Sequence, residues 1–277
     1  MADKSSIEWT DATWNPVMGC TPISEACDNC YARRMIRRYA GRRGWPESQD
    51  AVTLFPDRLD WPFRWRQPRR IFVCSMSDLF HPAVPFEFIV RVFDVMARSP
   101  RHTFLVLTKR AHRMRRAVKQ IWDGFAGAGL ETPLPNVWLG VTAENQKLVD
   151  ERIPPLLETP AAAHFVSVEP MLGPVNVSCW MNCGCDSPEN DYCDPGPWCA
   201  GYSALDWVIV GGETGPGARV MERAWVEDVL TQCELEGVPF FFKGWGTATM
   251  PKTEPDYRVL MGRRWERFPF FPVARDA

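Results

Sequence analysis

Short apolar runs recur along the chain at spacings typical of strands in a parallel sheet. Each run is rich in β-branched and aromatic residues, and each is too short and too continuous for an exposed helix. Such runs indicate strands that are buried on both faces. One further strand is expected just before Cys20. The six clearest runs are Ile71–Cys74, Thr103–Leu107, Val137–Val141, His164–Val168, Trp207–Val210 and Pro239–Phe242.

Amphipathic segments separate these runs, with apolar residues at every third or fourth position. They predict helices over Phe86–Arg98, His112–Trp122, Asn145–Leu157 and Ala224–Glu236, and a basic stretch predicts another over Asn29–Tyr39. Strands that alternate with helices are typical of a parallel sheet with right-handed crossovers. About seven βα units favour an α/β fold of the TIM type, a complete or partial (β/α) barrel. No Rossmann-type glycine fingerprint follows the first strand, which disfavours an open doubly wound sheet.

Residues 178–204 interrupt this alternation where a helix should connect two strands. We therefore expect a single barrel domain over residues 1–277, with 178–204 as a Cys-rich insertion whose fold comes from metal ligation or aromatic packing. Cys74 and Cys233, within a strand and a helix, are expected in the core. Zinc or a second iron–sulfur cluster could be held by the thiols of the insertion, which are Cys179, Cys183, Cys185, Cys193 and Cys199.

Composition adds a compartment and a possible partner. The chain has 277 residues, 45% of them hydrophobic, and no apolar run approaches the ~20 residues of a membrane helix. Ten cysteines without a signal-like start suggest metal ligands in a reducing cytoplasm. The net charge of −2 hides a basic first half, where nucleic acid could bind, although solvated helix faces explain it equally well. The basic residues include Arg33, Arg34, Arg37, Arg38, Arg42, Arg43, Arg64, Arg66, Arg69 and Arg70.

Three cysteines near the N-terminus carry the clearest chemistry. Cys20, Cys27 and Cys30 have the spacing C-x6-C-x2-C on a loop that leads into a helix, so their thiols can face one metal centre. Structural zinc normally takes four protein ligands, so three thiolates leave one position open for a small molecule. A zinc-knuckle fragment and three unrelated buried thiols are the alternatives.

This motif resembles that of the radical S-adenosylmethionine (SAM) superfamily, although the first gap is longer and the aromatic Tyr31 follows the last cysteine instead of preceding it. The chain also resembles a phage-associated, radical-SAM-like family over roughly Ile7 to Gly246. The segments that carry this resemblance are WNPVMGC, CDNCYA, SDLFHP, LTKR, PNVWLGVT, SVEPMLGP, DWVIVGGETGPGAR and FFFKGWG.

The resemblance implies a [4Fe-4S] cluster on Cys20, Cys27 and Cys30, with SAM on its open iron. It also implies reductive cleavage of SAM, hydrogen abstraction from a substrate, and an electron donor of the flavodoxin or ferredoxin type. The phage context and the basic first half make a modified nucleobase in DNA, or another nucleotide, the substrate hypothesis.

Polar motifs follow almost every predicted strand, at the end where barrel enzymes carry their working residues. Lys109, Glu169 and Lys243 are the candidate catalytic residues. The Gly-Gly-Glu segment could approach a ligand closely and accept hydrogen bonds from an ammonium group, a duty that Ser75 and Asp78 could take instead. The candidate cofactor-binding residues are Tyr31, Ser75, Asp78, Thr142, Glu144, Gly211, Gly212, Glu213 and Arg219.

Two other classes of function remain open. The first is a zinc-stabilised nucleic-acid-binding protein whose barrel has no catalytic activity, which predicts a strongly salt-dependent affinity for DNA or RNA. The second is a hydrolase or transferase that uses Asp78, Glu169 and Lys243, with purely structural cysteines.

Overall fold

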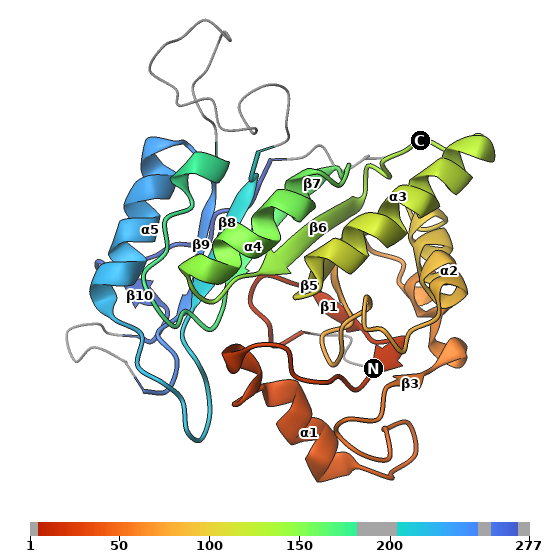
Figure 1. Ribbon diagram of the computed structural model, residues 1–277, viewed down its shortest axis with the longest axis horizontal. Helices are drawn as coiled ribbons and strands as arrows, with labels where there is room; N and C mark the ends of the chain where they lie inside the picture. Colours follow the sequence, from red (N-terminus) through yellow and green to blue (C-terminus); the bar gives the residue numbers. More distant parts are fainter. Residues whose placement is uncertain (1–4, 182–203, 249–255, 271–277) are drawn as a thin grey trace, which may run out of the picture.

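The computed structural model describes residues 5–181, 204–248 and 256–270. Its centre is a seven-stranded parallel sheet in which every strand pairs with the next one along the sheet (Figure 1). The strand order is β1 (Ala12–Trp14), β4 (Arg70–Val73), β5 (Thr103–Thr108), β6 (Val137–Thr142), β7 (Ala163–Val168), β8 (Trp207–Gly211) and β9 (Phe240–Gly244).

The sheet curls but stays open, because β1 and β9 are its two edges and do not pair with each other. Of the two architectures that the sequence allows, the structure is therefore compatible with a partial barrel and not with a complete one. All six predicted strand runs are confirmed, with ends that agree within two residues.

All described α-helices except the first cover one face of this sheet, and the first lies apart from them (Figure 1). The predicted helices are confirmed as α1 (Tyr31–Tyr39), α2 (Phe86–Ala97), α3 (Ala111–Gly127), α4 (Gln146–Leu157) and α5 (Arg223–Leu235). Only α3 departs by more than two residues from its predicted end. It continues beyond Trp122 because Phe125 is buried in the core and keeps the last turn packed.

The strand expected just before Cys20 is in fact two short strands. β1 joins the main sheet, whereas β2 (Val17–Met18) pairs antiparallel with β3 (Thr53–Leu54). Asn15 and Pro16 separate the two, since proline cannot donate a ladder hydrogen bond. A second antiparallel pair, the small hairpin of β10 (Val259–Leu260) and β11 (Arg263–Arg264), lies near the end of the described residues.

Short 3-10 helices complete the described elements. They are η1 (Glu25–Cys27), η2 (Pro56–Arg58), η3 (Trp61–Arg64) and η4 (Ser178–Trp180). The last of these belongs to the predicted insertion, whose Cys183, Cys185, Cys193 and Cys199 lie outside the described residues, whereas Cys179 is exposed. Cys74 and Cys233 are buried, as expected. No helix in the described ranges is both long and apolar enough to cross a membrane.

The two faces of the sheet have different cores because side chains alternate along each strand. The face under the helices is mainly aliphatic, as at Val106 and Val208, and also includes Phe240 and Phe242 of the edge strand β9. The other face is aromatic, with Phe165 and Trp207 at its centre and Trp9 packed over them. Toward the carboxyl ends of the strands, the positions on this second face become polar, at Lys109, Thr142, Ser167, Glu169 and Lys243.

Candidate functional site

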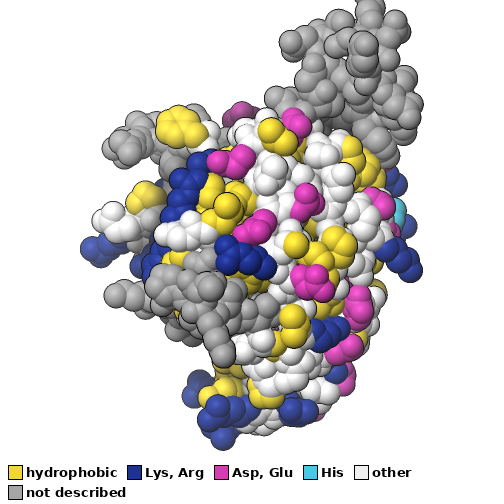
Figure 2. All heavy atoms as spheres, turned by 90° about the vertical axis from the view of Figure 1, so that its left-hand side faces the viewer, with side chains coloured by type: hydrophobic (Ala, Val, Ile, Leu, Met, Phe, Trp, Pro, Cys, Tyr) yellow, Lys and Arg dark blue, Asp and Glu magenta, His cyan; other side chains and the backbone are white. Residues whose placement is uncertain are grey.

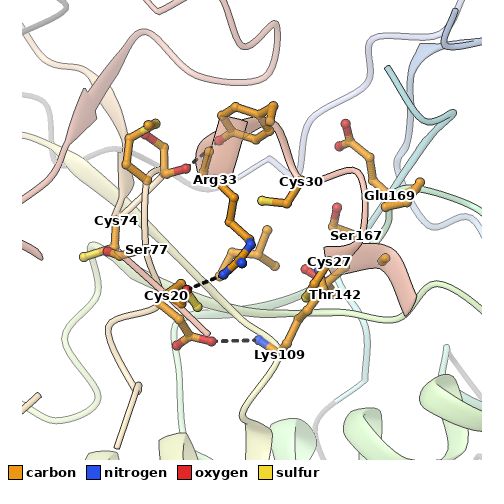
Figure 3. Close-up of a pocket in the computed structure, with 18 of the residues that line it drawn as sticks. Cys20, Cys27, Cys30, Arg33, Cys74, Ser77, Lys109, Thr142, Ser167 and Glu169 are labelled. Carbon is orange, nitrogen blue, oxygen red and sulfur yellow. Dashed lines mark hydrogen bonds between the residues drawn. The ribbon is translucent and has the colours of Figure 1, made fainter. Parts of the chain in front are cut away.

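One pocket lies over these polar strand ends, and the N-terminal cysteine segment and α1 form its other wall (Figure 3). Its apolar part includes Trp9, Phe72 and Leu107 from the aromatic face of the sheet. Twelve of the predicted site residues line it. They are Cys20, Cys27, Cys30, Tyr31, Ser75, Asp78, Lys109, Thr142, Glu169, Gly212, Glu213 and Lys243. Three others, Glu144, Gly211 and Arg219, do not line the pocket.

The residues that precede Cys20 anchor the cysteine segment to the loop after β4. The Asn15 side chain donates to Ser75 Oγ (3.1 Å) and accepts from the Met76 backbone N–H (3.0 Å). Gly19 has φ +90°, and a Cβ there would come within 2.1 Å of the Ala51 carbonyl oxygen. Only glycine fits this turn without strain. The lead-in to the first cysteine therefore has a structural reason independent of any ligand.

The three thiols are all partly exposed and lie around the same pocket (Figure 3). Cys27 ends η1, and Cys30 is the residue before the first turn of α1. Arg110 Nη1 lies 3.6 Å from Cys20 Sγ, and Arg33 Nη1 donates to the Cys20 carbonyl oxygen (2.9 Å). Burial raises the pKa of the Cys20 thiol to about 11, assisted by the charge of Asp78 and opposed by that of Arg110.

This donor set fits a cluster in number and in chemistry, because three thiols face one pocket and the Arg110 guanidinium lies beside one of them, Cys20, where it offsets negative charge. In a four-iron cluster each thiolate binds a different iron, so the thiols surround the cluster and do not converge on one point. Within the described part of the chain, no group of three or more His, Cys, Asp or Glu side chains is arranged to hold a single metal ion.

Asp78 makes contacts within the protein that leave little acceptor capacity for a ligand. It accepts from Thr108 Oγ1 (2.8 Å), from the Phe80 backbone N–H (2.9 Å) and from Arg110 Nη1 (3.0 Å). The Asp78–Arg110 ion pair is buried, with 7% and 10% of the two side chains exposed. Asp78 thus orients Arg110 toward Cys20, a positioning role that differs from the ammonium-binding role suggested by the sequence.

Glu213 is also engaged by the protein. It accepts from Arg219 Nε (2.9 Å) and Nη2 (2.6 Å) and from Asn29 Nδ2 (3.0 Å). Burial alone would raise the pKa of Glu213, but these hydrogen bonds outweigh burial and lower it. Arg219 Nη2 also donates to the Glu25 carbonyl oxygen (3.0 Å). The Gly-Gly-Glu loop therefore holds the segment that carries Cys27 and Cys30.

Glu169 and Lys243 form an ion pair on the wall of the pocket, between the ends of β7 and β9. Burial alone would lower the pKa of Lys243, but the neighbouring Glu169 carboxylate outweighs it and raises that pKa. Gly211 lies on β8 between the two, and a Cβ there would come within 3.2 Å of Lys243 Cβ and 3.4 Å of Glu169 Cδ. The first glycine of the segment thus makes room for the ion pair.

Lys109 differs from Lys243 because its ammonium group has no hydrogen bond or ion pair among the described residues. Its backbone N–H donates to Asp78, and its side chain lines the pocket. Glu144 lies elsewhere, in a fully buried ion pair with Arg152 (3.0 Å). Lys109 is therefore a predicted site residue whose charge is available to an anionic ligand.

Sequence reasoning missed several residues of the site. Arg33 contacts the cysteine segment directly, Asn29 lies within that segment and donates to Glu213, and Ser167 lines the pocket beside Glu169. Ser167 could have been found, since it lies two residues before Glu169 on the same side of a strand. Asn29 and Arg33 flank Cys30, but no local pattern reveals which partners they contact.

Fold and site together define a class of protein: an α/β protein with an open, curled parallel sheet and a thiol-lined pocket at the carboxyl ends of its strands. A family model described as "Protein of unknown function (DUF5131)" matches residues 4–269, and the chain belongs to this family. No curated protein and no solved structure matches the chain.

Proposed function

We propose that this protein is a radical SAM enzyme that binds a [4Fe-4S] cluster through Cys20, Cys27 and Cys30. The observation that carries the proposal is that these thiols line one pocket with Lys109 at the carboxyl end of a partial parallel barrel. When bound, the reduced cluster would supply the electron that cleaves SAM to a radical able to abstract hydrogen. A nucleobase in DNA, or another nucleotide, is the proposed substrate, and a flavodoxin or ferredoxin is the proposed electron donor.

The chain's own residues divide between two parts of the pocket. Lys109, with its unpaired ammonium group among the described residues, suits the carboxylate of SAM, and Arg110 stabilises the Cys20 thiolate. Glu169 follows β7, which lies two strands along the sheet from the strand before Lys109, a separation of roughly 10 Å at the usual strand spacing. Lys243 on β9 reaches back to pair with Glu169. This ion pair offers an acceptor and a donor to the substrate. The apolar side chains Trp9, Phe72 and Leu107 exclude water from the space between the two parts.

Anaerobic reconstitution tests the proposal directly. The protein is expected to bind about four irons at this site, to absorb in the visible range, and to release 5′-deoxyadenosine from SAM with dithionite. Cys20→Ala, Cys27→Ala and Cys30→Ala should each lose the iron and the activity, whereas Cys233→Ala, which removes a buried thiol of α5, should keep both.

Lys109→Ala separates cofactor binding from iron loading. It should retain the iron but weaken SAM binding about tenfold or more, because it removes a charged hydrogen-bond donor. Iron-loaded wild-type protein that shows no SAM binding would refute the proposal. A colourless protein with zinc at Cys20, Cys27 and Cys30 would favour the zinc-stabilised, non-catalytic alternative.

A further inference from the structure

Two groups stand out among the arginines of the basic first half. Most of them have partners within the protein. Arg64 pairs with Asp60, Arg70 with Asp11 and Arg110 with Asp78. Arg113 donates to backbone carbonyl groups, and Arg115 pairs with Glu158. A carboxylate thus offsets the charge of four of these five arginines, and all five are engaged within the protein.

The second group lies on the last turn of α1 and the turn that follows it. Arg37, Arg38, Arg42 and Arg43 are exposed, and none has a carboxylate partner among the described residues. No acidic residue occurs between Asn29 and Pro46. Lys and Arg side chains gather at the lower end of the face in Figure 2, the end of the molecule where α1 lies in Figure 1. We call these four residues the arginine patch.

Aromatic rings lie within the arginine patch. The guanidinium carbons of Arg38 and Arg42 lie 5.6 Å and 5.2 Å from the centroid of the Tyr39 ring. Tyr39 in turn packs on Trp45, with ring centroids 4.8 Å apart. Arginines combined with aromatic rings are typical of surfaces that bind single-stranded nucleic acid, where cations contact phosphates and rings stack on bases.

The protein holds this patch in a fixed shape. Gly41 donates to the Pro46 carbonyl oxygen (3.0 Å), which closes the turn that carries Arg42 and Arg43. Arg58 Nη2 donates to the Gly44 carbonyl oxygen (2.6 Å) and ties the same turn to the body of the protein. A surface ordered in this way loses less conformational entropy when it binds a partner.

The patch also adjoins the pocket. Tyr31 and Ile36 of the same helix line the pocket. Arg37 and Arg38 lie six and seven residues after Tyr31, which is roughly 10 Å along the helix axis. At ~3.4 Å or more per nucleotide, two or three nucleotides cover that distance. A strand bound at the patch could therefore deliver a neighbouring base to the pocket.

We infer that the arginine patch is the docking surface for a nucleic-acid strand whose base enters the thiol-lined pocket. This inference deepens the proposed function and rests on it only in taking the bound strand as the substrate. Phosphates would contact the four guanidinium groups, and bases would stack on the exposed part of the Tyr39 and Trp45 rings. An acidic membrane surface offers the same charge but no flat bases for these rings.

Fluorescence anisotropy with a labelled, mixed-sequence DNA strand of about 20 nucleotides tests the inference on full-length protein without SAM. If four phosphates are neutralised, affinity should fall about fifty-fold between roughly 50 and 200 mM salt. The variant Arg37→Gln/Arg38→Gln/Arg42→Gln/Arg43→Gln should bind about tenfold or more weakly. The control Arg91→Gln/Arg98→Gln/Arg101→Gln/Arg116→Gln removes the same charge from exposed positions elsewhere and should bind within about twofold of wild type.

The inference is overturned if the patch variant binds like wild type or if both variants weaken binding equally. It is also overturned if anionic vesicles displace the labelled strand more effectively than unlabelled strand does at the same concentration of negative charge. Thermal melting checks the fold, and if the fourfold variant is unfolded, the affinity of Arg37→Glu decides in its place. Iron content and 5′-deoxyadenosine are measured in parallel. Strand binding without SAM cleavage refutes the proposed function alone, and SAM cleavage without strand binding refutes the docking surface alone.

Discussion

Gly211 and Gly212 have different reasons to be glycine, and neither reason requires a ligand. A Cβ on Gly212 would come within 2.1 Å of the Trp245 carbonyl oxygen, so the backbones of β8 and the segment after β9 could not pack there. Gly211 leaves space through which Lys243 reaches Glu169. The sequence indicated a close approach at this point, and the structure shows that the approaching atoms belong to the protein itself.

Gly211→Val is therefore expected to destabilise the protein by about 1–3 kcal/mol, because the branched side chain overpacks this site and pushes Lys243 away from Glu169. The free energy of unfolding is measured by urea titration. Gly124→Ala is a matched control, since Gly124 lies inside α3 with no atom within 4 Å of an added Cβ. It should be neutral or stabilising by up to about 1 kcal/mol. Equal destabilisation of both variants would contradict this account of Gly211.

Charged residues show how far the candidate site could be predicted from the sequence. The rule that working residues follow parallel strands found Lys109, Glu169 and Lys243, and all three line the pocket. The same rule could not tell which charges are engaged by the protein. Glu144 pairs with Arg152 through the geometry of α4, and Asp78 accepts from Thr108, thirty residues away. These pairings depend on tertiary structure, which local patterns do not encode.

At the scale of elements, α1 and the cysteine segment depend on polar contacts more than on the core. Their apolar anchor is small, with Ala32 and Ile36 packed against Met18 and Met76. Several polar contacts run to the loop after β8. Arg34 Nη2 donates to the Thr214 carbonyl oxygen (2.7 Å), and Asn29 and Arg219 meet at Glu213. The position of Cys27 and Cys30 therefore depends on this loop.

Glu213→Gln tests this dependence through pH. The pKa of Glu213 is lowered in the folded protein, so its carboxylate contributes stability above the unfolded-state pKa of about 4.3, which is lost as pH falls through the folded-state value. At pH 7 the variant should be about 1–2 kcal/mol less stable than wild type, because it loses a charged acceptor for Arg219. The difference should narrow in acid, where wild-type Glu213 is itself protonated.

Urea titrations across this pH range measure the effect, with Glu227→Gln as the control. Glu227 forms an ion pair with Arg223 on the surface of α5, and such pairs contribute little. The control should stay within about 0.5 kcal/mol of wild type at every pH. A constant difference between Glu213→Gln and wild type down to strong acid would show that the carboxylate charge is not the cause.

The elements that the sequence predicted well are those with a clear period. Buried parallel strands are continuous apolar runs, so β5 to β8 could be located from hydrophobicity alone. The antiparallel pair of β2 and β3 could not be located in this way, because each strand has two residues and its partner lies more than thirty positions away. The end of α3 was missed because Gly124 and Gly127 are typical of a turn, whereas the burial of Phe125 keeps them helical.

At the scale of the molecule, the open side of the barrel requires a cover. A closed barrel would fill its interior with strand side chains, but here β1 and β9 leave the aromatic face accessible. Segments from the two ends of the chain cover it. Trp9 packs on Phe72 and Trp207, with ring centroids 4.7 Å and 6.2 Å apart. Phe268 packs on Trp207 from the other end of the chain, at 5.1 Å.

Phe268→Ala is accordingly expected to lower the free energy of unfolding by about 2 kcal/mol, less than a fully buried phenylalanine would cost because Phe268 is only half-buried. The variant removes the ring contacts with Trp207 and Phe241 and the cation–π contact with Arg70, whose guanidinium carbon lies 4.1 Å from the ring centroid. Phe270 offers a control of the same type two residues away. It is 95% exposed, so Phe270→Ala should change the free energy by less than about 0.5 kcal/mol. If urea titration gives both variants the stability of wild type, the C-terminal segment is not a structural cover, and another part of the chain must shield the aromatic face.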